Sequence, residues 1–326
     1  MKAVVFTKYG QPDVLELKEV AKPAPKDNEV LIKVHAASVN DWDWGLLRGK
    51  PFVNRLLFGL LKPKIKILGV DIAGRVEAVG RNAKQFSPGD EVFGDISGCG
   101  WGGFAEYVCV RENALALKPA GMTFEEAAAV PQAGLLALQG LRKGQIQPGQ
   151  KVLINGAGGG AGTFAVQIAK SFGAEVTGVD STNKLDMMRL IGADQVIDYT
   201  KEDFTKSGQC YDLILDVAAY HSIFDYKRAL CPKGIYVMVG GSTARASQVM
   251  FLGPWISMTG SKKMGLLMHK PNKGLAFMKE LFKAGKVVPV IDRRYTLSEV
   301  AEALRYFGEG HARGKVVITV ERNNNT

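Results

Sequence analysis

The sequence has few cysteines and no long apolar run, and both absences restrict the class of protein. Its four cysteines form no C-x-x-C pair and no tight cluster. A disulfide framework is therefore not expected in a chain of 326 residues, and a reducing, cytoplasmic location is expected instead. No stretch reaches the roughly 18 uninterrupted apolar residues of a membrane-spanning helix. The short apolar run at residues 3–6 is typical of a strand rather than of a signal peptide.

Histidine is equally sparse. The four histidines have no mutual spacing for a metal site or a proton relay, and they are His35, His221, His269 and His311. Metal sites in proteins need several ligands at close, recurring spacings. The histidines are therefore not expected to form a metal site.

The chain does have a soluble globular composition, with 46% apolar residues, 23% charged residues and a net charge of +10. Its length favours two domains. The surplus positive charge is local, because residues 48–68 and residues 262–286 each carry a net +6. Amphipathic helices with solvated lysines would explain both segments. An apolar mouth with a basic rim, beside the site of a lipophilic or anionic substrate, would explain them as well.

The hydrophobic pattern changes along the chain. The first 120 residues contain short β-branched runs that end in turn residues and predict strands. From Thr123, a predicted helix N-cap, strands alternate with helices. The strands of this second part are predicted at residues 152–154, 175–179, 195–197, 213–217 and 235–239. The alternation predicts an α/β fold with a doubly wound parallel sheet, and a last strand at 315–320 could return to the first domain.

One glycine-rich turn points to chemistry. The buried strand predicted at residues 152–154 is followed by a turn that opens a helix, with the residues Gly156, Ala157, Gly158, Gly159, Gly160, Ala161 and Gly162. Glycines let the backbone approach a pyrophosphate, and the helix N-terminus offers free N–H groups. The motif therefore predicts a dinucleotide site, and the alternative is a glycine turn in an α/β domain without a ligand.

Several ordered motifs resemble one family. They are the glycine turn with its flanks, Gly149 to Lys170, together with Ala37 to Asp43, Leu68 to Gly74, Ala133 to Leu135 and Gly314 to Val317. From about residue 1 to 321 the sequence resembles the zinc-independent medium-chain dehydrogenases/reductases of the quinone-oxidoreductase (zeta-crystallin-like) type. The resemblance implies a GroES-like β-barrel domain over residues 1–122 and 288–326, a Rossmann domain over 123–287, and a homodimer.

The resemblance also implies that zinc is absent. Zinc relatives carry Cys where this chain has Asn40, and Gly-His-Glu where it has Gly69, Val70 and Asp71. Their structural zinc lobe needs four close cysteines, and only Cys99 and Cys109 lie near that place. Without a Lewis acid, reduction of a quinone or an α,β-unsaturated carbonyl fits better than reversible alcohol oxidation.

The residues expected to bind the cofactor leave two nicotinamide nucleotides open. Asp180 ends the second strand of the alternating part, where an acid usually bonds the ribose hydroxyls of NAD. By resemblance, Lys184 and Tyr199 match positions that hold the 2′-phosphate of NADPH, and Ser181 matches a cofactor contact. We expect NADPH, with NADH possible because of Asp180. The resemblance adds further cofactor contacts at Gly240, Gly241, Ala312, Arg313 and Gly314.

The candidate catalytic residues are Asn40 and Asp43, which match cleft-lining positions of the family. Asn40 could hydrogen-bond a substrate carbonyl. Loop capping by Asx side chains explains both residues equally well. The acceptor could also take its proton from water.

The expected function is therefore NADPH-dependent hydride transfer to a small-molecule quinone or enone. Two other readings stay open, an alcohol-dehydrogenase-like aldehyde or ketone reductase and a cofactor-binding, redox-sensing protein with weak turnover. Nucleic acid is not an expected partner, because the basic segments are interleaved with Leu and Phe and match no recognition module.

Overall fold

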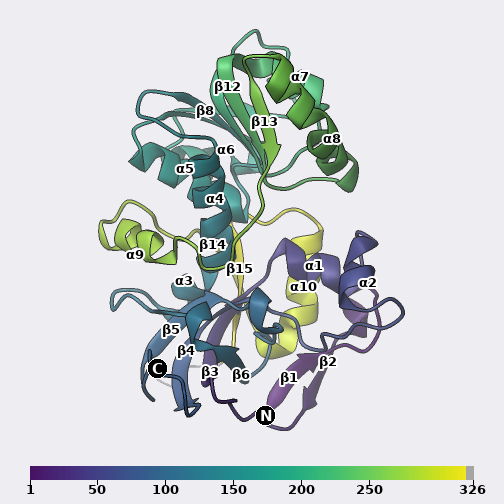
Figure 1. The fold of residues 1–326 in the computed structure, drawn as a ribbon, viewed down its shortest axis with the longest axis vertical. Coiled ribbons are helices and arrows are strands. Elements are labelled where there is room, and N and C mark those ends of the chain that lie inside the picture. Colours follow the sequence, from purple (N-terminus) through teal and green to yellow (C-terminus); the bar gives the residue numbers. More distant parts are fainter. Residues whose placement is uncertain (321–326) are drawn as a thin grey trace. The chain divides into compact units, whose positions relative to one another are not determined.

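The computed structural model describes residues 1–320, which fold into two units that are discontinuous in sequence (Figure 1). The first unit comprises Met1–Gln132, Pro271–Lys283 and the chain from Ile291 onward. The second comprises Ala133–Lys270 and Ala284–Val290. Over the described residues, no helix combines the length and apolarity that crossing a bilayer requires.

The first unit is built on a sheet of seven strands. Its order is β14-β15-β3-β4-β5-β7, with β6 paired to β3. The strands are β3 (Glu29–Ser38), β4 (Asp71–Val79), β5 (Glu91–Asp95), β6 (Tyr107–Arg111), β7 (Ala116–Leu117), β14 (Ile291–Thr296) and β15 (Lys315–Thr319). A small second sheet pairs β1 (Lys2–Val5) with β2 (Glu16–Glu19). The expected return of the last strand is confirmed, because β15 pairs antiparallel with β3 and places Ile318 opposite Ala37.

The first unit contains five helices within the described residues. They are α1 (Asp41–Arg48), α2 (Val53–Phe58), α3 (Phe124–Ala129), α9 (Leu275–Lys283) and α10 (Val300–Gly308). α10 buries Val300, Ala303 and Leu304 at a spacing that presents one apolar face. That face joins a core cluster that also contains the side chains of Leu47 from α1 and Ile318 from β15.

The second unit contains the predicted parallel sheet. Its six strands run in the order β10-β9-β8-β11-β12-β13, and every pair is parallel. They are β8 (Lys151–Asn155), β9 (Glu175–Asp180), β10 (Gln195–Asp198), β11 (Tyr211–Asp216), β12 (Leu230–Met238) and β13 (Lys263–Leu266). Val152, Leu153 and Ile154 are fully buried, as expected for a strand inside a sheet covered on both faces.

The connecting helices are α4 (Pro131–Lys143), α5 (Gly160–Ser171), α6 (Leu185–Leu190), α7 (Ile223–Ala229) and α8 (Thr243–Thr259). The doubly wound sheet and the barrel-type domain confirm the fold class. Within the basic segment 262–286 the chain forms strand β13 and helix α9. α9 buries Leu275, Met278 and Leu281 on one face, which matches the amphipathic interpretation for that half.

Two findings differ from expectation. The second domain was expected to begin at residue 123, yet α3 packs on β3, β4 and β15 and belongs to the first unit. Cys210 and Cys231 form a disulfide, with their Cα atoms 4.9 Å apart. The spacing of the cysteines does not predict this pair, because the register of β11 and β12 brings the two residues together.

Candidate active site

The glycine-rich turn follows β8 in the second unit. Its first residue, Gly156, has φ +81°, a left-handed conformation that side chains with a Cβ rarely adopt. The helix that follows has Gly159 as its N-cap, with no side-chain hydrogen bond to the first amides. Those amides have no partner inside the helix and carry its positive dipole end. This turn also lies at the point where the strand order reverses, since β9 and β11 flank β8 on opposite sides.

Two glycines of the turn lack a side chain for different reasons. A Cβ on Gly162 would lie 2.0 Å from the carbonyl oxygen of Gly156, so this glycine lets α5 pack closely on the turn. A Cβ on Gly159 would come no closer than 3.5 Å to that oxygen, which leaves room in front of the turn. A cradle of this kind fits the pyrophosphate of a dinucleotide.

The side chain of Asp180 points toward the glycine-rich turn. Its Oδ2 accepts a hydrogen bond from the N–H of Gly158 at 2.9 Å, and its Oδ1 lies 3.4 Å from Nζ of Lys184. Both side chains are buried, with at most 9% of either side chain exposed. The acid at the end of β9 is therefore hydrogen-bonded and paired within the protein, and the lysine beside it supplies a positive charge at the same place.

The other predicted cofactor residues of the second unit follow neighbouring strands. Ser181 donates from its hydroxyl to Oδ1 of Asn183 at 2.7 Å. Tyr199 follows β10, donates its backbone N–H to the carbonyl of Asp180 at 3.2 Å and is half exposed. Gly240 and Gly241 follow β12, and Gly241 has φ +136°. The carboxyl ends of parallel strands lie at one edge of the sheet, so these residues share the edge that carries the glycine turn.

A buried polar network that the sequence does not predict links the ends of two strands at this edge. Nδ2 of Asn155 donates to Oδ1 of Asp216 at 2.8 Å, which ties the end of β8 to the end of β11. The hydroxyl of Tyr236 donates to the other carboxylate oxygen of Asp216 at 2.7 Å. Burial raises the pKa of Asp216 to about 6, although these hydrogen bonds lower it.

The remaining predicted cofactor residues belong to the first unit. Ala312 is buried, and the N–H of Arg313 donates to Oδ2 of Asp292 at 3.0 Å, while the Arg313 side chain is exposed. Gly314 has φ +96° and leads directly into β15. Contact of these three residues with a cofactor stays a prediction.

Asn40 lies in a buried polar cluster of the first unit. Its Nδ2 donates to the carbonyl of Ser38 at 3.2 Å and to Oδ2 of Asp71 at 3.1 Å. Its Oδ1 accepts from Nζ of Lys315 at 2.6 Å. Both N–H groups of the amide are thus used inside the protein, so the orientation of Asn40 is fixed by three partners.

Lys315 provides the positive charge of this cluster. Its Nζ also donates to the carbonyl of Val39 at 3.2 Å and lies 3.9 Å from Oδ2 of Asp71. Both side chains are almost completely buried. Burial lowers the pKa of Lys315 and raises that of Asp71, while their mutual attraction opposes both changes.

Asp43 caps α1 as a capping-box residue. Its Oδ2 accepts from the N–H of Asn40 at 2.9 Å, and its Oδ1 accepts from the N–H of Gly69 at 2.8 Å. Burial raises the pKa of Asp43 to about 7, against the lowering effect of these two donors. The structure thus brings Asn40 and Asp43 together with Asp71 and Lys315, which the sequence analysis did not place in a site. The sequence does contain one signal for Lys315, because this lysine directly precedes an apolar run at residues 316–318, and a lysine buried with such a run needs a polar or acidic partner.

The cluster does not fit a zinc ion. Among residues 1–320, no group of three or more His, Cys, Asp or Glu side chains is arranged to hold a metal. At the position of the Cys ligand in zinc relatives, the Asn40 oxygen accepts from an ammonium group 2.6 Å away. A metal cation there would have to displace Lys315 or bear its repulsion.

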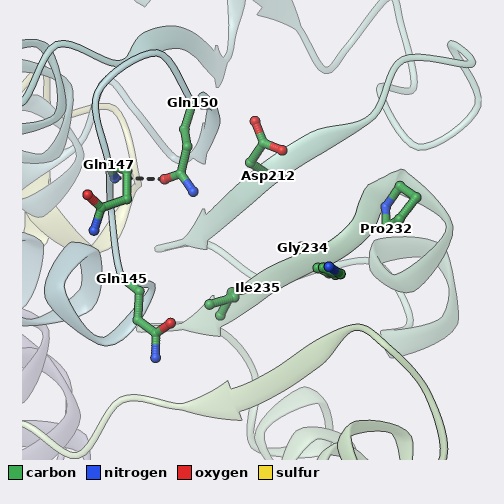
Figure 2. A pocket seen from close by; sticks show the side chains of 8 residues that line it. Gln145, Gln147, Gln150, Asp212, Pro232, Gly234 and Ile235 are labelled. Carbon is green, nitrogen blue, oxygen red and sulfur yellow. Dashed lines mark hydrogen bonds between the residues drawn. The ribbon is translucent and has the colours of Figure 1, made fainter.

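A separate hollow lies at the opposite edge of the same parallel sheet. Figure 2 shows Gln147, Gln150, Asp212 and Ile235 around it, with the N–H of Gln147 bonded to Oε1 of Gln150 at 2.8 Å. Its volume is about 270 Å³. Gln150 precedes β8, and Asp212 is the second residue of β11, so this hollow is not part of the glycine-turn edge.

The fold and these sites match known families and proteins. Residues 26–120 match the alcohol dehydrogenase GroES-like domain, and residues 191–318 match a family described as zinc-binding dehydrogenase. The chain is 36% identical to 2-methylene-furan-3-one reductase of Solanum lycopersicum, over 98% of this chain and 79% of that protein. It is 33% identical to the chloroplastic NADPH-dependent alkenal/one oxidoreductase of Arabidopsis thaliana, with the same coverage.

A solved structure agrees with these matches. The quinone oxidoreductase from Coxiella burnetii superposes with a TM-score of 0.88 at 31% identity, over 98% of this chain and 99% of that one. The matches cover both units, and the relatives are oxidoreductases that act on conjugated carbonyl compounds or quinones by name. The chain is thus an NAD(P)H-dependent oxidoreductase and belongs to the quinone-oxidoreductase family of medium-chain dehydrogenases/reductases.

Proposed function

We propose that this oxidoreductase uses NADPH to reduce a quinone or an α,β-unsaturated carbonyl compound. The observation that carries the choice of acceptor is the Asn40–Lys315 hydrogen bond, where zinc relatives hold a metal ligand. Conjugated acceptors take a hydride without a strong Lewis acid, whereas a simple ketone or alcohol depends on one more heavily. The relatives named above act on acceptors of this kind.

The second unit offers the means to hold the cofactor. The amides of Gly160 and Ala161, in the first turn of α5, would face the pyrophosphate, and Gly240 and Gly241 at the same edge would lie beside the nicotinamide half. When bound, the nucleotide supplies the hydride. The chain's own residues bind and orient it, and we propose that Ala312, Arg313 and Gly314 add contacts from the first unit.

The preference for NADPH rests on Lys184 and the two hydroxyl residues Ser181 and Tyr199. A 2′-phosphate carries about two negative charges, and a lysine beside hydroxyl groups can hold it through charge-assisted hydrogen bonds. Asp180 already bonds the Gly158 N–H, which supports the proposal because its carboxylate faces the turn. NADH stays the alternative, since an acid at this position can bond ribose hydroxyls.

Contact between the acceptor and Asn40 or Asp43 stays a proposal as well. Both side chains are buried and hydrogen-bonded within the first unit. We propose that Asn40 fixes the position of Lys315 and that the acceptor takes its proton from water.

A homodimer is proposed through an edge strand of the parallel sheet, where β10 and β13 have a neighbour on one side only within the described residues. The cytoplasmic location stays a prediction.

Oxidation of the nucleotide against a panel of acceptors tests this function. We expect kcat/KM for a quinone or an enone to exceed kcat/KM for an aldehyde. We also expect kcat/KM with NADPH to exceed kcat/KM with NADH. A strong preference for aldehydes would support the alcohol-dehydrogenase-like alternative. Failure to oxidise either nucleotide with every acceptor would favour the redox-sensing alternative.

A further inference from the structure

The first unit exposes an apolar surface between α1 and β4. Its members have 48–85% of their area exposed and are Phe52, Val53, Leu56, Leu57, Leu60 and Leu61. Helix α2, which lies beside α1 in Figure 1, contains no buried residue at all. Exposed apolar side chains are unremarkable one at a time, but a contiguous group marks a surface that another apolar phase covers.

The backbone that carries these side chains is anchored. The ring of Phe58 lies edge-on to Trp101, with 6.0 Å between ring centroids. The hydroxyl of Tyr9 donates to the carbonyl of Gly59 at 2.6 Å, and Pro63 is buried. Phe58, Gly59 and Pro63 hold the segment to the first unit. The leucines between and beside these three residues are exposed to solvent.

Basic residues surround the leucines, and acidic ones are missing. No Asp or Glu occurs between Asp43 and Asp71, whereas six cations do, namely Arg48, Lys50, Arg55, Lys62, Lys64 and Lys66. None of the six forms an ion pair with a carboxylate of the described residues. The four lysines are exposed, so their charges face water next to the exposed leucines.

We propose that residues 48–66 dock this protein on the surface of an anionic phospholipid bilayer. Leucine and phenylalanine side chains would enter the interface, and the lysines would meet lipid phosphates. Surface-bound amphipathic segments combine these residue types, and each lysine near an anionic leaflet strengthens binding about fivefold.

Two other occupants fit less well. A second copy seated on the same patch would bring six cations against six cations, because a two-fold interface is formed by the same patch on both copies. A soluble acidic protein would have to cover a surface rich in lysine, a residue that is depleted in protein–protein interfaces. A bilayer supplies both the apolar phase and the negative charge.

Flotation of the full-length protein with vesicles tests the proposal. We expect the protein to float with vesicles of phosphatidylcholine and phosphatidylserine at low salt, to bind phosphatidylcholine alone much more weakly, and to be released by salt. In the variant Leu61→Gln/Lys62→Gln/Lys64→Gln, binding should fall about 30-fold from the loss of two lysines alone, and further from the loss of the leucine.

A matched variant controls for charge and exposure. Leu117→Gln/Lys26→Gln/Lys84→Gln removes the same residue types, with Lys26 and Lys84 at the other end of the β3–β4 pair, and should bind vesicles like the wild type. Equal binding of both variants, or no binding by the wild type, would overturn the proposal. So would a wild-type dimer that the Leu61 variant dissociates without any vesicle binding. The assay measures binding without turnover, so its result is independent of the proposed reaction.

Discussion

Nζ of Lys315 lies 2.6 Å from Oδ1 of Asn40, although 275 positions separate the two residues in the chain. The ammonium group is buried, and the Asn40 oxygen is its closest partner. This hydrogen bond joins the last strand of the first unit to the N-cap of α1, and it determines what several substitutions should do.

Replacing Asn40 by Ala should cost about 1–3 kcal/mol of stability, because a buried ammonium loses an acceptor. If Asn40 only positions Lys315, KM for the acceptor should change little once the protein is folded. A large loss of kcat/KM at unchanged nucleotide KM would instead assign acceptor contact to Asn40. Thermal unfolding and steady-state kinetics measure both quantities, and Asn54→Ala, which removes a surface hydrogen bond to Lys50, serves as the control.

Replacing Lys315 by Met should destabilise the protein more strongly, by about 3–5 kcal/mol, because Asp71 is left as an uncompensated buried charge. Adding Asp71→Asn to the same chain should recover part of that loss, since no charge then remains at the pair. Urea unfolding of both single variants and the double variant measures the coupling. Strictly additive losses would contradict the pairing of the two residues.

The proton at Asp43 should appear in the pH dependence of stability. Burial raises the pKa of Asp43 to about 7 in the folded protein, while an unfolded Asp titrates near pH 3.9. Between about pH 4 and pH 7 the folded state therefore binds more protons than the unfolded chain, so this group makes the free energy of unfolding fall as pH rises. Each unit of pKa difference corresponds to about 1.4 kcal/mol.

Urea titrations at several pH values can isolate this effect by comparison with Asp43→Asn, which has no proton to lose. Trp42, Trp44 and Trp101 report on the first unit, which contains Asp43. We expect the free energy of unfolding of the wild type, relative to that of the variant, to fall steadily from pH 4 to pH 7. Parallel stability curves for the two proteins would show that Asp43 is ionised throughout.

Two glycine substitutions separate packing from cofactor binding. Gly162→Ala places a Cβ 2.0 Å from the Gly156 carbonyl and should destabilise the second unit by about 3 kcal/mol. Gly159→Ala meets that oxygen at 3.5 Å, so the fold should tolerate it, whereas the methyl group occupies the space in front of the turn. We expect Gly159→Ala to keep the melting temperature and to weaken nucleotide binding in titration calorimetry.

Lys184 should decide between the two nucleotides. Lys184→Met removes the positive charge beside Asp180, so kcat/KM with NADPH should fall about tenfold or more while that with NADH changes little. Lys206→Met removes a lysine that pairs with Asp203 at the surface and should alter neither value. An equal loss with both nucleotides would mean that Lys184 serves the fold rather than the 2′-phosphate.

The glycine turn and its strands were predictable because strand, turn and helix are adjacent in the chain and carry local signals. Lys315 and Asp71 were not, since their pairing depends on β15 lying antiparallel to β3, which is itself paired with β4. The Cys210–Cys231 disulfide has the same origin in the pairing of β11 with β12. Strand β13 escaped prediction because its four residues, Lys-Met-Gly-Leu, have no clear alternation of apolar and polar side chains.

The pairing of β15 with β3 also fixes an order of events during synthesis. All six strands of the parallel sheet are made before Lys315, so the sheet of the second unit can form before the barrel closes. The first third of the chain contains Asp43 and Asp71, and its sheet cannot be completed until the final strand and Lys315 have been made. A nascent chain stopped short of β15 would thus hold a formed parallel sheet and an unclosed barrel in which Asp71 lacks its lysine partner.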